Sequence, residues 1–294
     1  MENRILREFI LNSLTEDLGD GDHSSLACIP IGAKGKAKLL IKEKGVLAGI
    51  RIAKEVFSTI DKDLKFDLIL DDGTNVVPGD IAFYLSGNQQ SMLKSERLVL
   101  NIMQRMSGIA TSTHEYTLLL KGFKTRILDT RKTTPGFRFL EKEAVRIGGG
   151  TNHRMGLFDM IMLKDNHIDY AGGIEKAINK TREYLKKNNL SLKVEIEARS
   201  MADVRTILST GGVDRIMLDN FSIDETRLAV KEISGRYETE SSGGIDLSTI
   251  RAYAECGVDF ISVGALTHHI KSLDMSLKAD AERLLTISRN EETS

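Results

Sequence analysis

Residues 193–220 read KVEIEARSMADVRTILSTGGVDRIMLDN and contain two strand-like segments, which end at Glu197 and Asp219. Similar segments recur from about residue 124 onward, with helical stretches between most of them, and they end at Asp129, Lys164, Ser241 and Gly264. Strands that alternate with helices predict parallel strands joined by right-handed crossovers. Because these units are fewer than the eight of a closed barrel, the pattern predicts an incomplete, open α/β barrel.

The N-terminal region has a different pattern. Short alternating runs such as Lys36–Ile41 and Phe66–Leu70 are mixed with helical segments, without regular alternation between the two. A long helix follows at about residues 98–110, and Arg97, Asn101 and Arg105 lie at four-residue steps along one side of it. These features predict an α+β layer that precedes the barrel.

The overall composition excludes several classes of protein. The chain has 41 Lys and Arg residues against 42 Asp and Glu, so a general nucleic-acid-binding protein is not expected. Cys28 and Cys256 lie far apart, which argues against a disulfide scaffold or a cysteine-rich zinc site. No apolar run reaches the ~18 residues of a membrane span. The opening residues mix both charges and do not resemble a secretory signal, so we expect a cytoplasmic protein.

Charged residues follow nearly every predicted barrel strand, at the edge where barrel enzymes place their chemistry. Arg131 and Arg154 could each form paired hydrogen bonds with a carboxylate or a phosphate. Lys132 and Lys164 add positive charge to the same region. These residues predict a binding site for an anionic small molecule.

The predicted helix after Pro135 carries further basic residues. Arg138, Lys142 and Arg146 are interleaved with Glu141 and Glu143. Mixed charges of this kind are typical of a helix face in water, so we expect the three basic side chains to be solvated.

Glycine-rich runs near the C-terminus predict a phosphate site. The run Ser241–Ile245 follows a strand and precedes a helix, so its backbone N–H groups and the positive end of that helix could hold a phosphate. The run Val263–Ala265, at the end of the next strand, would form the other half of the site.

Glu197 and Asp219 end adjacent predicted strands, so we expect their carboxylates to lie near each other. Two oxygen ligands of this kind suit Mg²⁺ together with substrate oxygens, and they could instead bind sugar hydroxyls or act as acid and base. Alternatively, they neutralise Arg131 and Lys164. We expect His153 to donate a hydrogen bond to a substrate rather than bind a metal, because no second histidine lies four residues away.

Together these stretches resemble a known family, the decarboxylating quinolinate phosphoribosyltransferases, or nicotinate-nucleotide pyrophosphorylases, of NAD synthesis. The resemblance covers almost the whole chain in order. The matching runs are Glu16–Asp22, Glu96–Leu98, Gln104–Thr111, Asp129–Gly136, Gly148–Arg154, Leu163–His167, Glu195–Glu197, Leu218–Asn220, Glu240–Gly244 and Val263–His268.

The resemblance implies an α/β protein with two domains. An N-terminal α/β sandwich over residues 1–108, joined by a C-terminal helix over 270–294, precedes an incomplete α/β barrel over 109–269, which is the catalytic domain. It also implies a homodimer in which Arg97 enters the neighbouring active site, and it leaves open whether dimers assemble into a hexamer.

The resemblance further implies the reaction, a pentosyl transfer. Quinolinate and phosphoribosyl pyrophosphate would give nicotinate mononucleotide, pyrophosphate and CO₂, with Mg²⁺ and without an organic cofactor. The residues that would face quinolinate and pyrophosphate are Arg97, Thr130, Arg131, Lys132, His153, Arg154 and Lys164. Those that would hold the phosphoribosyl group are Glu197, Asp219, Ser242, Gly243, Gly244, Val263, Gly264 and Ala265. Lys132, Glu197 and Asp219 would be catalytic, and the two acidic residues would bind Mg²⁺, directly or indirectly.

Two other functions stay open at this point. A paralogous phosphoribosyltransferase of the same fold could act on another substrate, such as a monocarboxylate. A non-catalytic barrel could bind a phosphate ligand in a regulatory role, although simple phosphate capture would not require the carboxylates of Glu197 and Asp219.

Overall fold

The computed structural model describes residues 2–280, and the chain divides into two compact units. The N-terminal unit comprises Met1–Thr111 with Ile270–Ser294, and the barrel unit comprises Ser112–His269. The division lies three residues beyond the predicted end of the first domain. Gly108 and Thr111 stay with the N-terminal unit because Gly108 packs closely on the backbone of Lys271 and Thr111 Oγ1 accepts a hydrogen bond from the N–H of Val46.

The N-terminal unit combines an antiparallel sheet with helices. Its helices are α1 (Glu2–Leu18), α2 (His23–Cys28), α3 (Ile50–Ile60) and the first part of α4 (Gln89–Leu119), which continues into the barrel unit. Its strands are β1 (Lys34–Ile41), β2 (Gly45–Val46), β3 (Lys65–Leu68), β4 (Asn75–Val76), β5 (Ile81–Asn88) and β12 (Met275–Ala279). Within the described residues one sheet has the order β12-β1-β5-β3, and β2 pairs separately with β4.

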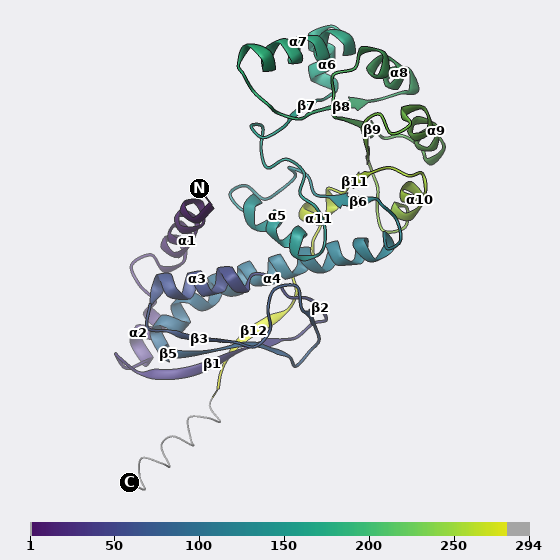
Figure 1. Cartoon of the computed structure of the whole chain (residues 1–294). Helices are drawn as coiled ribbons and strands as arrows, with labels where there is room; N and C mark the ends of the chain where they lie inside the picture. Colours follow the sequence, from purple (N-terminus) through teal and green to yellow (C-terminus); the bar gives the residue numbers. More distant parts are fainter. Residues whose placement is uncertain (1, 281–294) are drawn as a thin grey trace. The chain divides into compact units, whose positions relative to one another are not determined.

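The core of the N-terminal unit lies between this sheet and its helices. In β1, every second residue is buried, including Leu39 and Ile41. Helix α3 and the first part of α4 run along one face of the sheet (Figure 1). The ring of Phe57 in α3 packs edge-on against that of Phe83 in β5, with centroids 5.8 Å apart. The sheet and helices therefore form the predicted α/β layers.

The segment after residue 270 does not begin with the predicted helix. Residues 275–279 form β12, which pairs antiparallel with β1, so that Leu277 lies opposite Leu39. Met275 is buried at the start of this strand. An alternating side-chain pattern beside a strand edge with free hydrogen-bonding groups favours strand addition over a helix. The rest of the predicted helix, residues 281–294, lies outside the described residues.

The barrel unit is built from parallel strands and covering helices. Its strands are β6 (Arg126–Leu128), β7 (Ile161–Leu163), β8 (Val194–Ala198), β9 (Arg215–Asp219), β10 (Glu238–Ser242) and β11 (Phe260–Ser262). Its helices are α5 (Arg138–Ile147), α6 (Asp165–Ala171), α7 (Ile174–Lys187), α8 (Met201–Thr210), α9 (Ile223–Ile233), α10 (Ile250–Glu255) and α11 (Ala265–His268). The sheet order is β6-β11-β10-β9-β8-β7. Because β6 and β7 remain at its edges, this is the predicted open α/β barrel.

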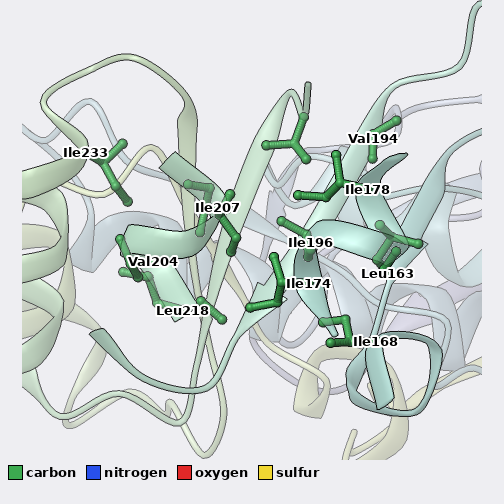
Figure 2. Close-up of a cluster of buried hydrophobic side chains, with 14 of the residues drawn as sticks. Leu163, Ile168, Ile174, Ile178, Val194, Ile196, Val204, Ile207, Leu218 and Ile233 are labelled. Atoms are coloured by element: carbon green, nitrogen blue, oxygen red, sulfur yellow. The ribbon is translucent and has the colours of Figure 1, made fainter. Parts of the chain in front are cut away.

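An apolar layer joins the barrel sheet to its outer helices. Figure 2 shows this cluster, in which Ile196 and Leu218 of the strands meet Ile178 of α7 and Val204 of α8. Successive residues of a strand point to opposite faces of the sheet. The sequence neighbours of Ile196, Glu195 and Glu197, therefore face the other side. The apolar layer thus fixes the strands and directs their charged residues toward the barrel interior.

None of the helices in residues 2–280 has the length and apolar character needed to cross a membrane.

Candidate functional site

A cavity of about 790 Å³ lies in the barrel unit, and the carboxyl ends of its strands contribute many of the lining residues. The lining consists of Thr130, Arg131, Lys132, His153, Arg154, Met162, Lys164, Glu197, Met217, Asp219, Asn220, Glu240, Ser242, Gly243, Gly244, Ile245, Asp246, Ser262, Val263, Gly264, Ala265 and His268. Every predicted site residue of the barrel is in this set. The structure therefore gathers into one cavity the residues that the sequence singled out at separate strand ends.

Arg97 is the predicted site residue that the cavity lining does not include. It lies in α4, within the N-terminal unit, and its side chain is exposed. Its predicted role in a neighbouring active site stays a prediction.

Positive charge gathers on one part of the cavity wall. Arg154 is buried, and its guanidinium donates a hydrogen bond to the carbonyl of Met160 at 3.1 Å. Burial lowers the pKa of Arg154, and the neighbouring charge of Arg131 lowers it further. Nε of Arg131 is buried and has no hydrogen-bond partner within residues 2–280. Two guanidiniums that repel each other, with one donor unsatisfied, are suited to an anionic ligand.

Two carboxylates also line the cavity, as the sequence predicts. Glu197 forms an ion pair with Lys164 and accepts a hydrogen bond from the N–H of Asp165 at 3.2 Å. Asp219 accepts a hydrogen bond from the side chain of Asn220 at 2.9 Å. Burial raises the pKa of Asp219, and the negative charge of Glu197 raises it further. A divalent cation would relieve this repulsion, so the two carboxylates fit the predicted Mg²⁺.

The glycine-rich wall of the cavity depends on unusual backbone conformations. Gly243 and Gly244 have φ of +105° and +60°, which L side chains rarely adopt. A Cβ on Gly243 would also overlap Oδ1 of Asn220. The helix expected directly after this run begins later, at Ile250, because Asp246 and the residues after it form turns. Any phosphate contact here therefore depends on loop N–H groups rather than on the end of that helix.

At the floor of the cavity lies a group of buried charges, of which the sequence analysis assigned His153 alone to the site. Nε2 of His153 is 2.9 Å from Oε2 of Glu195 and 3.4 Å from Oε2 of Glu240. The guanidinium of Arg215 donates a hydrogen bond to Glu240 at 2.9 Å. The sequence did contain a signal for this group: charged residues within the barrel strands, namely Glu195, Arg215 and Glu240. Their positions along the strands could have predicted side chains that face the barrel interior.

His153 could join Glu195 and Glu240 as a metal ligand, since one potential ligand atom of each lies within 4.8 Å of the others. Arg215 argues against this interpretation, because its positive charge already neutralises one of the two carboxylates. We interpret the group as a set of buried charges at the floor of the cavity, and the expectation that His153 does not bind a metal stays a prediction.

The hydrogen bonds of His153 indicate where its ring proton lies. Nδ1 accepts a hydrogen bond from the N–H of Arg154 at 2.7 Å, so the proton is on Nε2, beside the carboxylates. Burial lowers the pKa of His153, but Glu195 and Glu240 outweigh burial and raise the pKa to about 9. A pKa of about 9 would put a second proton on the ring at neutral pH, but that proton would have to displace the Arg154 hydrogen bond at Nδ1. This contact decides for the singly protonated ring.

Lys142 contradicts the expectation of a solvated helix face. Its side chain is completely buried and forms an ion pair with Asp129, which is also completely buried. Glu141 is buried as well, whereas Arg146 is exposed. The mixed charges along α5 did not predict this buried ion pair, because the acidic partner of Lys142 lies thirteen residues earlier in the chain, at the end of β6.

Other cavity residues were missed by the sequence analysis. Met162 and Met217 lie one and two residues before the ends of β7 and β9, and Ser262 is the last residue of β11. Their place in the strands could have identified them, because interior-facing residues lie at alternate strand positions. His268, which precedes a second histidine in the sequence, also lines the cavity.

Comparison with known proteins identifies the family. Residues 22–107 match the domain described as "Quinolinate phosphoribosyl transferase, N-terminal domain", and residues 109–278 match the corresponding C-terminal domain. The chain belongs to the quinolinate phosphoribosyltransferase family. The resemblance inferred from the sequence motifs is thereby confirmed.

Quinolinate phosphoribosyltransferases from distant organisms align with most of the chain. "Quinolinate phosphoribosyltransferase [decarboxylating] 1b" of Nicotiana tabacum is 45% identical over 97% of this chain and 85% of its own length. "Probable nicotinate-nucleotide pyrophosphorylase [carboxylating]" of Bacillus subtilis is 41% identical over 94% of both chains. The solved structure of the nicotinate-nucleotide pyrophosphorylase from Francisella tularensis is 40% identical, with a TM-score of 0.88 over 95% of this chain and 97% of that one. The predicted fold class is therefore confirmed by solved members of the family.

Proposed function

We propose that this protein transfers the phosphoribosyl group of phosphoribosyl pyrophosphate to quinolinate, with loss of CO₂, to form nicotinate mononucleotide and pyrophosphate. The observation that carries the proposal is the single cavity that joins the cations Arg131 and Arg154, the acidic pair Glu197 and Asp219, and the glycine-rich loop. The names of relatives at more than 40% identity, which state the same activity, support it.

The cationic wall is suited to a substrate with two carboxylates. Arg131, Arg154 and Lys164 supply fixed positive charges, and Nε of Arg131, which has no hydrogen-bond partner in the described part of the chain, offers a hydrogen bond to a ligand. A pyridine dicarboxylate satisfies several such donors at once. We assign Lys132, with Thr130 beside it, to the pyrophosphate side of the cavity. The turn that carries the two residues is exposed, and a hydrogen bond of 3.0 Å from the N–H of Lys132 to Oγ1 of Thr130 fixes it.

The acidic pair is suited to the charge that develops during transfer. As the bond from ribose to pyrophosphate breaks, positive charge builds on the ribose ring while the pyridine nitrogen approaches. The carboxylates of Glu197 and Asp219 stabilise this charge and accept hydrogen bonds from the ribose hydroxyls. They would also hold Mg²⁺, which would neutralise the pyrophosphate leaving group. The ion pair with Lys164 holds Glu197 in position for both roles.

Loss of CO₂ follows from the charge of the new bond. Once the ring nitrogen is bonded to ribose it is cationic, and the electron pair left by the departing carboxylate lies beside that positive charge. The neighbouring cation stabilises this carbanion as in the thiamine ylide, and uptake of one proton from water at the same carbon gives the mononucleotide, so no organic cofactor is required. The contribution of the protein is position and charge.

The 5′-phosphate is assigned to the glycine-rich loops. Ser242 ends β10 and the two glycines 243 and 244 follow it, while residues 263–265 follow β11, so that the two loops face the same cavity. A Cβ added to Gly264 would lie 2.9 Å from Nε2 of His268. Because glycine has no Cβ, the backbone at this position stays accessible to a ligand.

The homodimer, and Arg97 in the neighbouring site, are part of this proposal. The exposed side chain of Arg97, on the long helix α4, is available to a second copy of the chain. Assembly of such dimers into a hexamer is tested by the mass of the particle in solution. The cytoplasmic location predicted from the sequence is likewise proposed, and fractionation of cells tests it.

The decisive experiment offers the protein quinolinate, phosphoribosyl pyrophosphate and Mg²⁺, and follows CO₂ and the mononucleotide by mass spectrometry. A parallel reaction offers nicotinate in place of quinolinate. We expect both products with quinolinate and little turnover of nicotinate. Faster turnover of nicotinate would favour a paralogous transferase, and tight binding of phosphoribosyl pyrophosphate without any product would favour a non-catalytic barrel.

A further inference from the structure

The Asp129–Lys142 ion pair has no contact with solvent, since both side chains are completely buried. Burial raises the pKa of Asp129 and lowers that of Lys142, so the interior disfavours each charge taken alone. Neither residue lines the cavity. A buried ion pair contributes little to stability compared with apolar residues of the same size, so the pair calls for another explanation.

The pair holds the chain at His153 through its backbone. Oδ1 of Asp129 accepts a hydrogen bond from the N–H of His153 at 2.8 Å, and Nζ of Lys142 donates one to the carbonyl oxygen of His153 at 3.0 Å. Asn152 closes the network, because its side-chain amide donates to Oδ2 of Asp129 at 2.5 Å and to the carbonyl of Lys142 at 2.7 Å. Both polar backbone groups of His153 are therefore held by one ion pair.

The two segments joined in this way carry the two guanidiniums of the cavity. Arg131 follows Asp129 by two residues at the end of β6, and Arg154 follows His153 directly. These guanidiniums repel each other, and Arg131 lowers the pKa of Arg154 for this reason. Two like charges in one cavity separate unless the backbone that carries them is held in place.

We propose that Lys142 is a positioning residue for the anion-binding pair: by bridging Asp129 and the carbonyl of His153, it holds Arg131 and Arg154 at the separation that a dicarboxylate requires. This inference rests on the proposed function, because it names quinolinate as the ligand of the pair. Lys142 acts through Arg131 and Arg154 and does not touch the substrate. The loops after β10 and β11, to which the 5′-phosphate is assigned, contain none of the residues of this network.

The test compares Lys142→Met with Arg146→Met, a change on the exposed side of the same helix. We expect the KM for quinolinate to rise at least about tenfold in Lys142→Met, because small displacements of binding groups have large effects. The KM for phosphoribosyl pyrophosphate should rise by a smaller factor, because its 5′-phosphate is assigned to the loops after β10 and β11. Arg146→Met should leave both values unchanged. An unchanged KM for quinolinate in Lys142→Met, or an equal rise in both KM values, would overturn the proposal.

A second variant separates positioning from stability. Asp129→Asn/Lys142→Met removes both buried charges, while the Asn carbonyl can still accept the His153 N–H. We expect the melting temperature to recover relative to Lys142→Met while the KM for quinolinate remains raised. Recovery of that KM together with the melting temperature would show a merely structural role. Failure of the proposed function itself is distinguishable, because the wild-type protein would then form no mononucleotide in the same assay.

Discussion

The side-chain amide of Asn220 donates a hydrogen bond to Oδ2 of Asp219 at 2.9 Å, directly beside the acidic pair of the cavity. Burial and the charge of Glu197 raise the pKa of Asp219, and this hydrogen bond acts in the opposite direction. Asn220 can make it because its backbone is left-handed, with φ of +56°. A strand-end residue of this kind links backbone conformation to the charge state of the neighbouring carboxylate.

Asn220→Gly should shift the acid limb of the pH–activity profile to higher pH. Glycine accepts the left-handed backbone, so the change removes the hydrogen bond without adding strain. Asp219 is needed as a carboxylate, and activity is lost as the pH falls through its raised pKa. Loss of the hydrogen bond raises that pKa further, so the loss begins at higher pH. Profiles of kcat/KM measure the effect.

Asn189→Gly is the matched control for this change, since Asn189 is exposed and also left-handed, with φ of 52°. Its profile should superimpose on that of the wild-type protein. An acid limb that stays in place, or moves to lower pH, in Asn220→Gly would contradict the assigned role of Asp219.

Two alanine substitutions in the glycine-rich loop should differ in severity. Gly243→Ala places a Cβ against Asn220 at φ of +105°, whereas Gly244→Ala, at φ of +60°, meets no atom within 4 Å. Gly244→Ala should therefore cost about 1–2 kcal/mol of stability, the strain of a left-handed alanine. Gly243→Ala should in addition displace the loop and weaken binding of phosphoribosyl pyrophosphate at least about tenfold.

Calorimetric titration with phosphoribosyl pyrophosphate and thermal unfolding measure the two effects on Gly243→Ala and Gly244→Ala. Equal affinities in the two variants would mean that the loop does not contact the phosphate.

Removal of Mg²⁺ with a chelator should abolish turnover, and added Mg²⁺ should restore it. Asp219→Asn should raise the Mg²⁺ concentration needed for half-maximal activity, because one of the two carboxylates loses its charge. Asp224→Asn, a change at an exposed residue paired with Arg227, should leave the Mg²⁺ response unchanged. Full activity in the presence of excess chelator would exclude the proposed metal requirement.

Mixed dimers test the proposed role of Arg97. Arg97→Ala and Lys164→Ala should each have little activity alone. If Arg97 serves the neighbouring site, a mixed dimer contains one site that carries both changes and one site that carries neither. Refolding the two variants together in equal amounts should then restore about one quarter of the wild-type turnover. No recovery, in a mixture shown by mass to contain mixed dimers, would place Arg97 in the site of its own chain.

Local sequence patterns were sufficient for much of the fold and site. The short apolar segments that end near Glu197 and Asp219 form β8 and β9, which are buried along almost their whole length, as strands of a parallel sheet are when both faces are covered. Parallel strands bring their carboxyl ends to one edge, so residues predicted at separate strand ends meet in the cavity. The sequence therefore predicted which cations and carboxylates line the cavity, whereas their roles toward a ligand stay predictions.

Local patterns failed where a residue has a distant partner. Lys142 looks like a solvated helix residue until Asp129 is placed against it. The strand β12 exists because β1 offers an edge more than two hundred residues earlier in the chain.

The order of residues alone determined the alternation of strands and helices and the type of charge at each strand end. Both features follow from interactions between residues that are near neighbours in the chain. The packing of the whole unit decided which charges are buried. Glu195, Arg215 and Glu240 lie together beside His153 because separate strands bring them together. A charge in the interior is stable only beside its partner, and that partner is identified only when the strands and helices have been placed in space.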